Sequence, residues 1–385
     1  MPSFPGRRHI GRVNGSPLKG TDQKKVTMMK NPQCVRMLRG LLLLFGPVTF
    51  ALAEPIEFVP CCAPLDRPVR DHAAFYEGPL IDGHTHLDPG SSKAYRDDML
   101  AVVSQGILDG LVLMPTPNHG RMDAGGGSVK QMANLAAQSG GAISTLCGSN
   151  DWNTWMGRQL SVSDSGLEKR RGELEARIAS GACSGIGEIA TRHFEKWSGQ
   201  AVLTVDFRSR ALHALFALAQ DHKVPIDLHV EPMDRGNSHE QAVFAELDEI
   251  FNRYPDITVI LAHTAMTSAA NVERLIARYP RLYFSIKAVG RHKHWYNLEP
   301  VNFSKKKKAW FYEDWAQLLE RYPGRFFIGS DYKFARKLKN SPGGNKSVKK
   351  YTKYIKRYRG LLGSLDPQAA RQIAWDTPRK LFGME

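Results

Sequence analysis

The chain has 385 residues, of which 42% are hydrophobic and 24% are charged. That hydrophobic share is enough to bury a large core, which excludes a wholly disordered chain. Lysine and arginine number 53 against 38 aspartates and glutamates, a formal net charge of +15. Such an excess favours an anionic partner only if the charge lies on the folded part of the chain.

The first 53 residues have the features of a leader. Arg36 and Arg39 precede an apolar run from Leu41 to Ala53, and Ala51-Leu52-Ala53 matches the small-x-small pattern of a cleavage site. The run is about half as long as the roughly 20 residues that a membrane-spanning helix needs. We therefore predict a signal peptide that is cleaved after Ala53 and a periplasmic or secreted protein. An uncleaved anchor and a disordered arm are the alternatives.

Much of the positive charge belongs to this leader. Residues 1–53 hold nine basic residues and one acidic residue, which leaves 44 against 37 and a net charge of +7. Two basic runs, 305–308 and 332–360, hold 15 basic residues and no acidic residue, so the rest of the chain is acidic. Such runs can contact a small anionic substrate, a nucleic acid or a membrane surface, although nucleic acid is not favoured. They can equally form the solvated face of a helix.

Short apolar runs alternate with amphipathic segments from Pro79 onward. Eight runs are predicted as strands: 79–87, 109–115, 142–148, 183–190, 225–231, 257–263, 282–288 and 325–331. Seven segments between them have apolar residues at helical spacing: 93–105, 128–139, 166–180, 207–222, 239–254, 271–279 and 312–322. Tyr-Pro pairs at residues 254, 279 and 322 predict the ends of three of these helices. Two more helical segments, 348–362 and 366–382, complete the chain.

Buried strands that alternate with helices predict an α/β fold with a parallel sheet, and eight such units favour a (β/α)8 TIM barrel. We expect a single catalytic domain over residues 79–385 with C-terminal helices, preceded by an N-terminal extension over 54–78. No GxGxxG motif opens a helix after the first strand, which argues against a dinucleotide-binding fold. Five cysteines are too few for a disulfide scaffold, although export would permit a bridge.

Six side chains that can ligate a metal lie at the ends of five of these strands. They are His84, His86, Glu188, His229, His263 and Asp331. The carboxyl ends of barrel strands meet at one mouth, so these side chains should converge. Imidazole with carboxylate suits zinc, manganese, iron or nickel better than calcium. The sequence therefore predicts a site for one or two divalent ions, of which zinc is the favoured one. Each residue taken singly could instead be a hydrogen-bonded core residue.

The segments that carry these residues resemble the metal-dependent amidohydrolase superfamily. They are LIDGHTHLD, GIGEIA, IDLHVEP, VILAHTA and FFIGSD, in that order. The last two look most like the amidohydrolase-2 (amidohydrolase-related) branch, whereas the first two also look like TatD-type nucleases. The resemblance covers residues 79–385. One departure is Asp376, where the family usually has asparagine, and we expect it to affect helix capping more than chemistry.

The resemblance implies a role for each of the six residues. His84, His86 and Asp331 would bind a buried metal, His229 and His263 a second one, and Glu188 would bridge the two. With a single metal, His84, His86, His229 and Asp331 would hold it, and His263 would orient substrate or water. Asp331 would accept the proton of a metal-activated water, which makes Asp331 and His263 the predicted catalytic residues.

Two loops after the strands offer candidate substrate contacts. Trp152 and Trp155 follow the third strand, and Lys287 and Arg291 follow the seventh. Aromatic and cationic side chains together suit a substrate with an apolar body and an anionic group. The alternative is that the tryptophans pack the loop onto the barrel and that the lysine is solvated.

The prediction for function is a metal-dependent hydrolase that acts on an amide, ester or lactone bond of a small substrate. A TatD-like phosphodiesterase or deoxyribonuclease, a metal-dependent decarboxylase and a non-catalytic metal-binding barrel are the alternatives. The ligand set does not distinguish C–N, C–O and P–O cleavage, and the sequence does not predict an oligomeric state.

Overall fold

The computed structural model describes residues 67–71, 74–87, 93–117, 127–157, 164–194, 202–234, 237–287, 302–304, 310–334 and 345–384. All of them belong to one compact unit, residues 56–385. The predicted leader, Arg291 and the basic run 305–308 lie outside the described residues. No helix in the described ranges is both long and apolar enough to cross a membrane.

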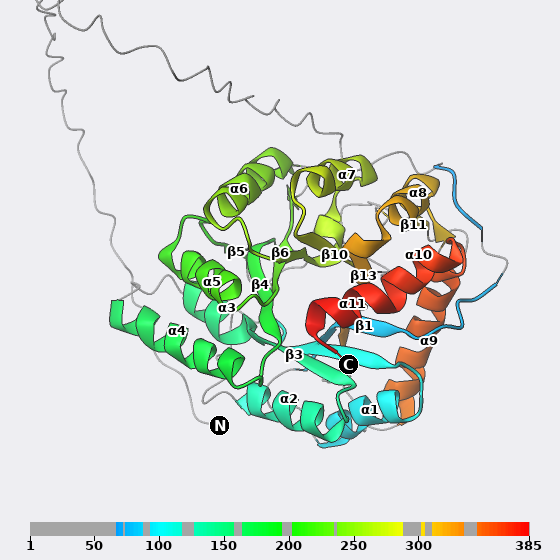
Figure 1. Cartoon of the computed structure of the whole chain (residues 1–385), viewed down its shortest axis with the longest axis horizontal. Helices are drawn as coiled ribbons and strands as arrows, with labels where there is room; N and C mark the ends of the chain where they lie inside the picture. The colour runs from blue at the N-terminus through cyan, green and yellow to red at the C-terminus, as the bar shows by residue number, and fades with distance from the viewer. Residues whose placement is uncertain are drawn as a thin grey trace, which may run out of the picture. The chain divides into compact units, whose positions relative to one another are not determined.

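Eight parallel strands follow one another around the barrel in chain order (Figure 1). They are β1 (Ile81–His86), β2 (Gly110–Met114), β3 (Ile143–Gly148), β4 (Gly185–His193), β6 (Ile226–Val230), β9 (Val259–Leu261), β10 (Leu282–Ile286) and β13 (Phe326–Ile328). Each lies within one of the predicted strands, except that β4 runs three residues further. The predicted (β/α)8 barrel is confirmed.

The eighth strand segment closes the ring because it hydrogen-bonds to both of its neighbours. β13 pairs with β10, and the short strand β14 (Tyr332–Lys333) pairs in parallel with β1. Between them, the Gly329 N–H donates to the Ile286 carbonyl and the Asp331 N–H donates to the His84 carbonyl. The close of the barrel therefore holds Asp331 beside the end of β1.

Helices cover the outside of the barrel. They are α1 (Lys93–Ser104), α2 (Gly127–Gln138), α4 (Asp164–Ala179), α5 (Arg210–Asp221), α6 (Glu240–Arg253), α7 (Ala269–Arg278), α8 (Glu313–Arg321) and α9 (Asn345–Leu362). Tyr254, Tyr279 and Tyr322 are the C-terminal cap residues of α6, α7 and α8, as the Tyr-Pro pairs predict.

Two predicted segments differ from the structure. Residues 149–157, predicted as loop, form helix α3 (Ser149–Gly157). The predicted helix 366–382 is divided into α10 (Pro367–Arg371), a π-helical turn (Gln372–Asp376) and α11 (Thr377–Phe382). Pro378 explains the division, because proline has no N–H to donate and its ring crowds the carbonyl one turn earlier.

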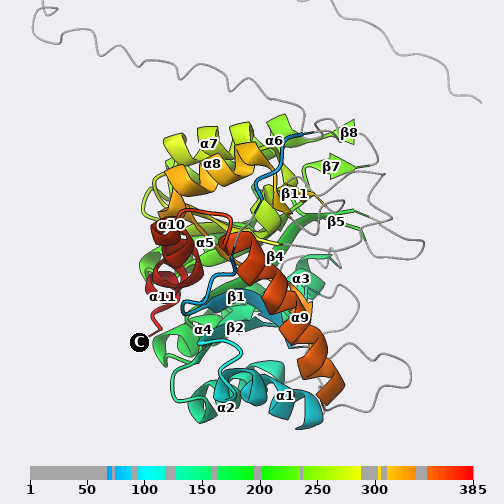
Figure 2. The ribbon, with the colours of Figure 1, turned by 90° about the vertical axis from the view of Figure 1, so that its right-hand side faces the viewer.

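Short strands and the C-terminus lie on opposite sides of the barrel (Figure 2). On one side are β5 (Leu203–Thr204), β7 (Met233–Asp234), β8 (Asn237–Ser238) and β11 (Phe303–Ser304), which pairs with β12 (Trp310–Phe311). On the other side are α10 and α11. The short strands follow the carboxyl ends of the barrel strands, so their side is the one on which a barrel site opens.

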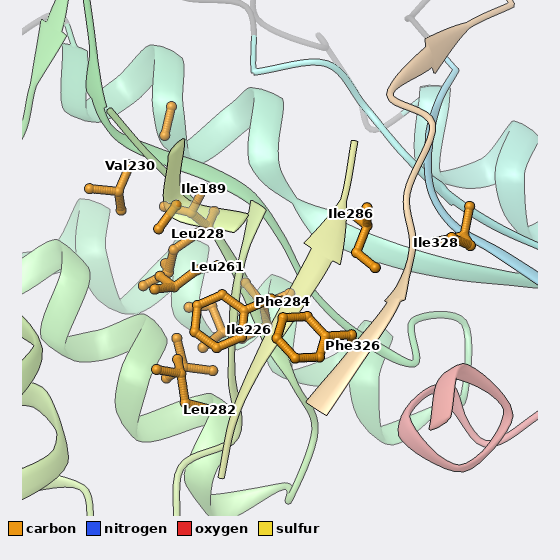
Figure 3. Packing of buried hydrophobic residues seen from close by; sticks show 14 of the residues in the cluster. Ile189, Ile226, Leu228, Val230, Leu261, Leu282, Phe284, Ile286, Phe326 and Ile328 are labelled. Carbon is orange, nitrogen blue, oxygen red and sulfur yellow. The ribbon is translucent and has the colours of Figure 1, made fainter. Parts of the chain in front are cut away.

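The apolar core lies in two clusters. Outward-facing strand residues such as Leu228, Phe284 and Phe326 pack under the helices (Figure 3). A smaller cluster joins Phe327 to Phe382 of α11, with ring centroids 5.4 Å apart. Each such side chain stabilises the fold by about 1.5–3 kcal/mol when it is fully buried. The predicted ligands lie away from these two apolar clusters, at the carboxyl ends of the strands.

Cys147 in β3 and Cys183 just before β4 form a buried disulfide. The bridge joins positions 36 residues apart, and closing a loop of this size restricts the unfolded chain by about 4 kcal/mol. We therefore expect the double variant Cys147→Ser/Cys183→Ser to unfold with a free energy lower by about 4 kcal/mol, measured by urea titration. Wild-type protein in reductant is the matched control and should shift in the same direction. Superimposable unfolding curves would contradict a stabilising role for the bridge.

Candidate metal centre

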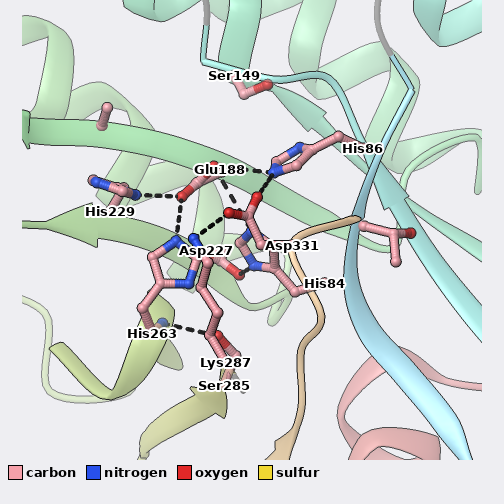
Figure 4. A network of polar contacts seen from close by, with 12 residues as sticks. His84, His86, Ser149, Glu188, Asp227, His229, His263, Ser285, Lys287 and Asp331 are labelled. Carbon is pink, nitrogen blue, oxygen red and sulfur yellow. Dashed lines mark hydrogen bonds and ion pairs between the residues drawn. The ribbon is translucent and has the colours of Figure 1, made fainter. Parts of the chain in front are cut away.

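The six predicted ligands converge at the carboxyl ends of the strands (Figure 4). Five of them are buried, and the Asp331 side chain is 15% exposed. The His84 ring centroid lies 5.0 Å from that of His86 and 5.2 Å from that of His263, which is 5.1 Å from that of His229. Residues up to 247 positions apart in the sequence thus form one polar cluster inside the barrel.

Glu188 lies between two pairs of imidazoles. Its Oε1 is 2.6 Å from His229 Nδ1 and 3.5 Å from His263 Nε2. Its Oε2 is 3.5 Å from His86 Nε2 and 3.7 Å from His84 Nε2. Burial would raise the pKa of Glu188, but the charges of His229 and His84 outweigh it and hold that pKa well below its usual range. Each carboxylate oxygen therefore faces one histidine pair, in its ionised form.

Asp331 joins the cluster to Lys287. Its Oδ1 is 2.8 Å from His86 Nε2, and its Oδ2 accepts a hydrogen bond from Lys287 Nζ. Burial would raise the pKa of Asp331, but Lys287 and His86 hold it well below the usual range. Burial and the nearby Lys287 also lower the pKa of His263 well below normal, which favours its neutral, ligating form.

Two of the six residues have a left-handed backbone. The φ angles are 51° at Asp331 and 59° at His263, and the residues from His263 to Met266 all have positive φ. Such a conformation costs roughly 1–3 kcal/mol for each non-glycine residue and is concentrated at functional sites. Buried Ser285 of β10 supports the turn, because its Oγ accepts the His263 N–H at 3.1 Å.

The donor set fits a divalent metal ion. His84 Nε2, His86 Nδ1 and His263 Nδ1 are buried and have no hydrogen-bond partner, whereas His86 Nε2 lies 2.8 Å from Asp331 Oδ1. An unsatisfied buried nitrogen costs about 1–3 kcal/mol, and a metal ion is the partner that several converging imidazoles share. Three groups drawn from the six residues each have ligand atoms within 4.8 Å of one another: His84/His86/Glu188, His84/His263/Asp331 and Glu188/His229/His263.

Comparison with known families agrees with this chemistry. The family model described as Amidohydrolase matches residues 81–384, which is the whole barrel and the C-terminal helices. The chain belongs to the amidohydrolase family. It is a metal-dependent enzyme of this superfamily. The resemblance to TatD-type nucleases is not confirmed.

Several solved structures resemble this amidohydrolase, whereas no curated protein matches it by sequence. An uncharacterized TIM-barrel protein from Bordetella bronchiseptica is 14% identical, with 80% of this chain and 99% of that chain covered and a TM-score of 0.47. A 2,6-dihydroxybenzoate decarboxylase is 13% identical, with 79% and 99% covered and a TM-score of 0.48. A dihydroorotase from Campylobacter jejuni is 13% identical, with 82% and 86% covered and a TM-score of 0.45. Their activities belong to those proteins and do not decide the reaction of this amidohydrolase.

The predicted substrate residues lie in different surroundings. Trp152 and Trp155 are only 2% and 6% exposed and belong to the main apolar cluster, with ring centroids 5.5 Å apart. The predicted loop is wrong here, and the burial supports the alternative in which the tryptophans pack the segment onto the barrel. Lys287 lies in the site itself, so it is not the solvated strand-end lysine of the alternative.

The basic helix α9 has a charged outer face and a buried aromatic face. Its lysines 349, 350, 353 and 356 are exposed, whereas Tyr351 and Tyr358 are buried. The Tyr351 hydroxyl donates to Asp82 Oδ2 at 2.6 Å, and the Tyr358 hydroxyl donates to the Gly329 carbonyl at 3.2 Å. These two tyrosines fasten α9 to the barrel and are not available to stack on bases.

Three residues that the sequence analysis did not select support the cluster. Asn153 of α3 donates to the Glu188 carbonyl and accepts the Ala190 N–H, both at 3.0 Å. Asp227 contacts His84, and Glu231 contacts His229. The sequence pattern could have identified Asp227 and Glu231, because they lie two residues before and after His229 in a predicted strand. It could not have identified Asn153, because the role of that residue depends on helix α3, which was not predicted.

Proposed function

We propose that this amidohydrolase uses an activated water to hydrolyse an amide, ester or lactone bond of a small substrate, at a site for two divalent ions. The placement of Glu188 carries the proposal. One carboxylate whose two oxygens each face a histidine pair is suited to bridge two cations, which would supply an acidified water and polarise the substrate carbonyl.

The protein residues divide the remaining work. A divalent ion bound here would supply an acidified water and would polarise the bond to be cleaved. Asp331, kept ionised by Lys287, would accept a proton from water and pass it to the leaving group. His263 would be neutral at physiological pH and therefore free to ligate. Lys287, 13% exposed, would attract an anionic group of the substrate.

The disulfide supports the proposal that the protein acts outside the cytoplasm. Structural disulfides persist in oxidising compartments such as the periplasm and are rare in the cytosol. Together with the signal-like pattern that ends at Ala53, the buried Cys147–Cys183 bridge favours an exported enzyme.

A substrate panel tests the proposed reaction. Zinc-loaded enzyme should hydrolyse members of a set of lactones, esters and amides, and chelation should remove the activity until zinc is restored. Carboxylated aromatic acids and phosphodiesters belong in the same panel. Release of carbon dioxide would favour the decarboxylase alternative, and cleavage of phosphodiesters alone would favour the phosphodiesterase; either result would replace the proposed reaction.

A further inference from the structure

Strand β6 points three ionisable side chains into the site. Asp227, His229 and Glu231 alternate along the strand and its end, so they share one face, whereas Leu228 and Val230 face the apolar core (Figure 3). All three are buried. The histidine is one of the predicted ligands, but neither carboxylate belongs to that set.

Asp227 contacts a histidine of a different strand. Its Oδ2 lies 3.0 Å from Nδ1 of His84, and both side chains are fully buried. A carboxylate at this position accepts a hydrogen bond from Nδ1–H, which keeps the ring proton on Nδ1 and leaves Nε2 with its lone pair. That Nε2 lies 3.7 Å from Glu188 Oε2 and has no hydrogen-bond partner, so it is directed at the space that a metal ion would occupy.

Glu231 contacts His229 at the other type of ring nitrogen, Nε2. Its Oε1 lies 2.8 Å from Nε2 of His229, whose Nδ1 is 2.6 Å from Glu188. Glu231 is itself fixed by the end of β4 and the residue after it, because its Oε2 accepts the Phe194 N–H at 2.9 Å and its backbone N–H donates to the Arg192 carbonyl at 3.1 Å. A carboxylate at Nε2 leaves Nδ1 as the ligating nitrogen.

We propose that Asp227 and Glu231 are positioning residues that select opposite ring nitrogens of the two histidines for the metal centre, Nε2 of His84 and Nδ1 of His229. A carboxylate on the distal nitrogen of a ligating histidine fixes its tautomer and orientation and makes it a better donor. Here a single strand supplies both carboxylates, each two residues from His229. The inference rests on the proposed metal site and adds which nitrogen each histidine uses.

Histidine tautomers in the zinc-loaded wild-type protein test the proposal without any variant. Long-range ¹H–¹⁵N spectra of ¹⁵N-histidine-labelled protein should place the ring proton on Nδ1 of His84 and on Nε2 of His229. A proton on Nε2 of His84 would overturn the proposal. A proton on Nδ1 of His229 would also overturn it, because His229 would then face a metal bound with His193 and Glu231, whose ligand atoms form a fourth group within 4.8 Å.

Zinc titrations of two isosteric variants provide the second test. Asp227→Asn and Glu231→Gln should each weaken zinc binding by about 10–100-fold at fixed pH, with the thermal unfolding of the metal-free protein little changed. The control is Asp248→Asn, which removes a carboxylate that contacts Arg278 and Tyr279. Wild-type zinc affinity in both variants would overturn the proposal.

The titrations also separate this proposal from the proposed reaction. If zinc binding depends on both carboxylates but the protein hydrolyses nothing in the panel, only the proposed reaction is disproved. If the protein hydrolyses a panel substrate and both variants keep the wild-type zinc affinity, only the positioning role is disproved. A variant that does not fold leaves the other variant and the wild-type spectra to decide.

Discussion

Asp331→Asn should lower turnover by at least about 10³-fold and leave the barrel folded. An amide cannot accept the proton of a water, and positioned general bases contribute about 10²–10⁴-fold. The substitution also removes the negative charge that faces His86 and Lys287, so a metal ion would lose an anionic ligand at the same time. Both effects act on the same step, which is why we expect a larger loss here than at any other position of the site.

Initial rates on a panel substrate, together with thermal unfolding and metal content, measure this effect. Asp248→Asn is the matched control, because it makes the same chemical change on α6 and should keep full activity. Full activity of metal-stripped Asp331→Asn enzyme would show that neither Asp331 nor a metal takes part in the reaction.

Glu188→Gln should remove at least one of the two proposed metal ions from the protein. A glutamine offers one carbonyl oxygen in place of two carboxylate oxygens, and two cations would then face each other without the negative charge between them. We expect the weaker ion to bind at least about 100-fold less tightly and turnover to fall with it. The matched control is Glu246→Gln, a carboxylate paired with Arg192. An unchanged number of ions with unchanged affinity would exclude Glu188 as a bridge.

The barrel could be predicted because its signals are local. The strands are fully buried and therefore appear as short apolar runs, and the helices between them carry one apolar face. The Tyr-Pro pairs mark three helix ends, because proline cannot continue a helix. The convergence of the six ligands follows from the fold, since each is at or near the carboxyl end of a barrel strand.

Helix α3 could not be predicted, because its stability comes from distant contacts. The segment 149–157 is short and mostly polar. Its helix depends on the burial of Trp152 and Trp155 and on the hydrogen bonds of Asn153 to β4. Tertiary packing here outweighs local propensity. The sequence leaves both substrate contact and packing open for these two tryptophans, and their burial favours packing.

Other features were present in the sequence pattern but were not used. Tyr351, Ile355, Tyr358 and Leu362 share one face of α9 at helical spacing, which would have predicted that the tyrosines face the core. The alternation of Asp227, His229 and Glu231 would likewise have placed both carboxylates beside the site. The left-handed backbone at His263 and Asp331 has no such signal, because neither residue is glycine.

The number of metal ions bound per chain tests the central claim most directly. Purified protein without residues 1–53, loaded with zinc and freed of excess ion, should contain two ions per chain by elemental analysis, and Glu188→Gln should contain at most one. One ion in the wild-type protein would contradict the bridging role of Glu188. No bound ion, with all six residues intact, would contradict the account of this site as a metal centre.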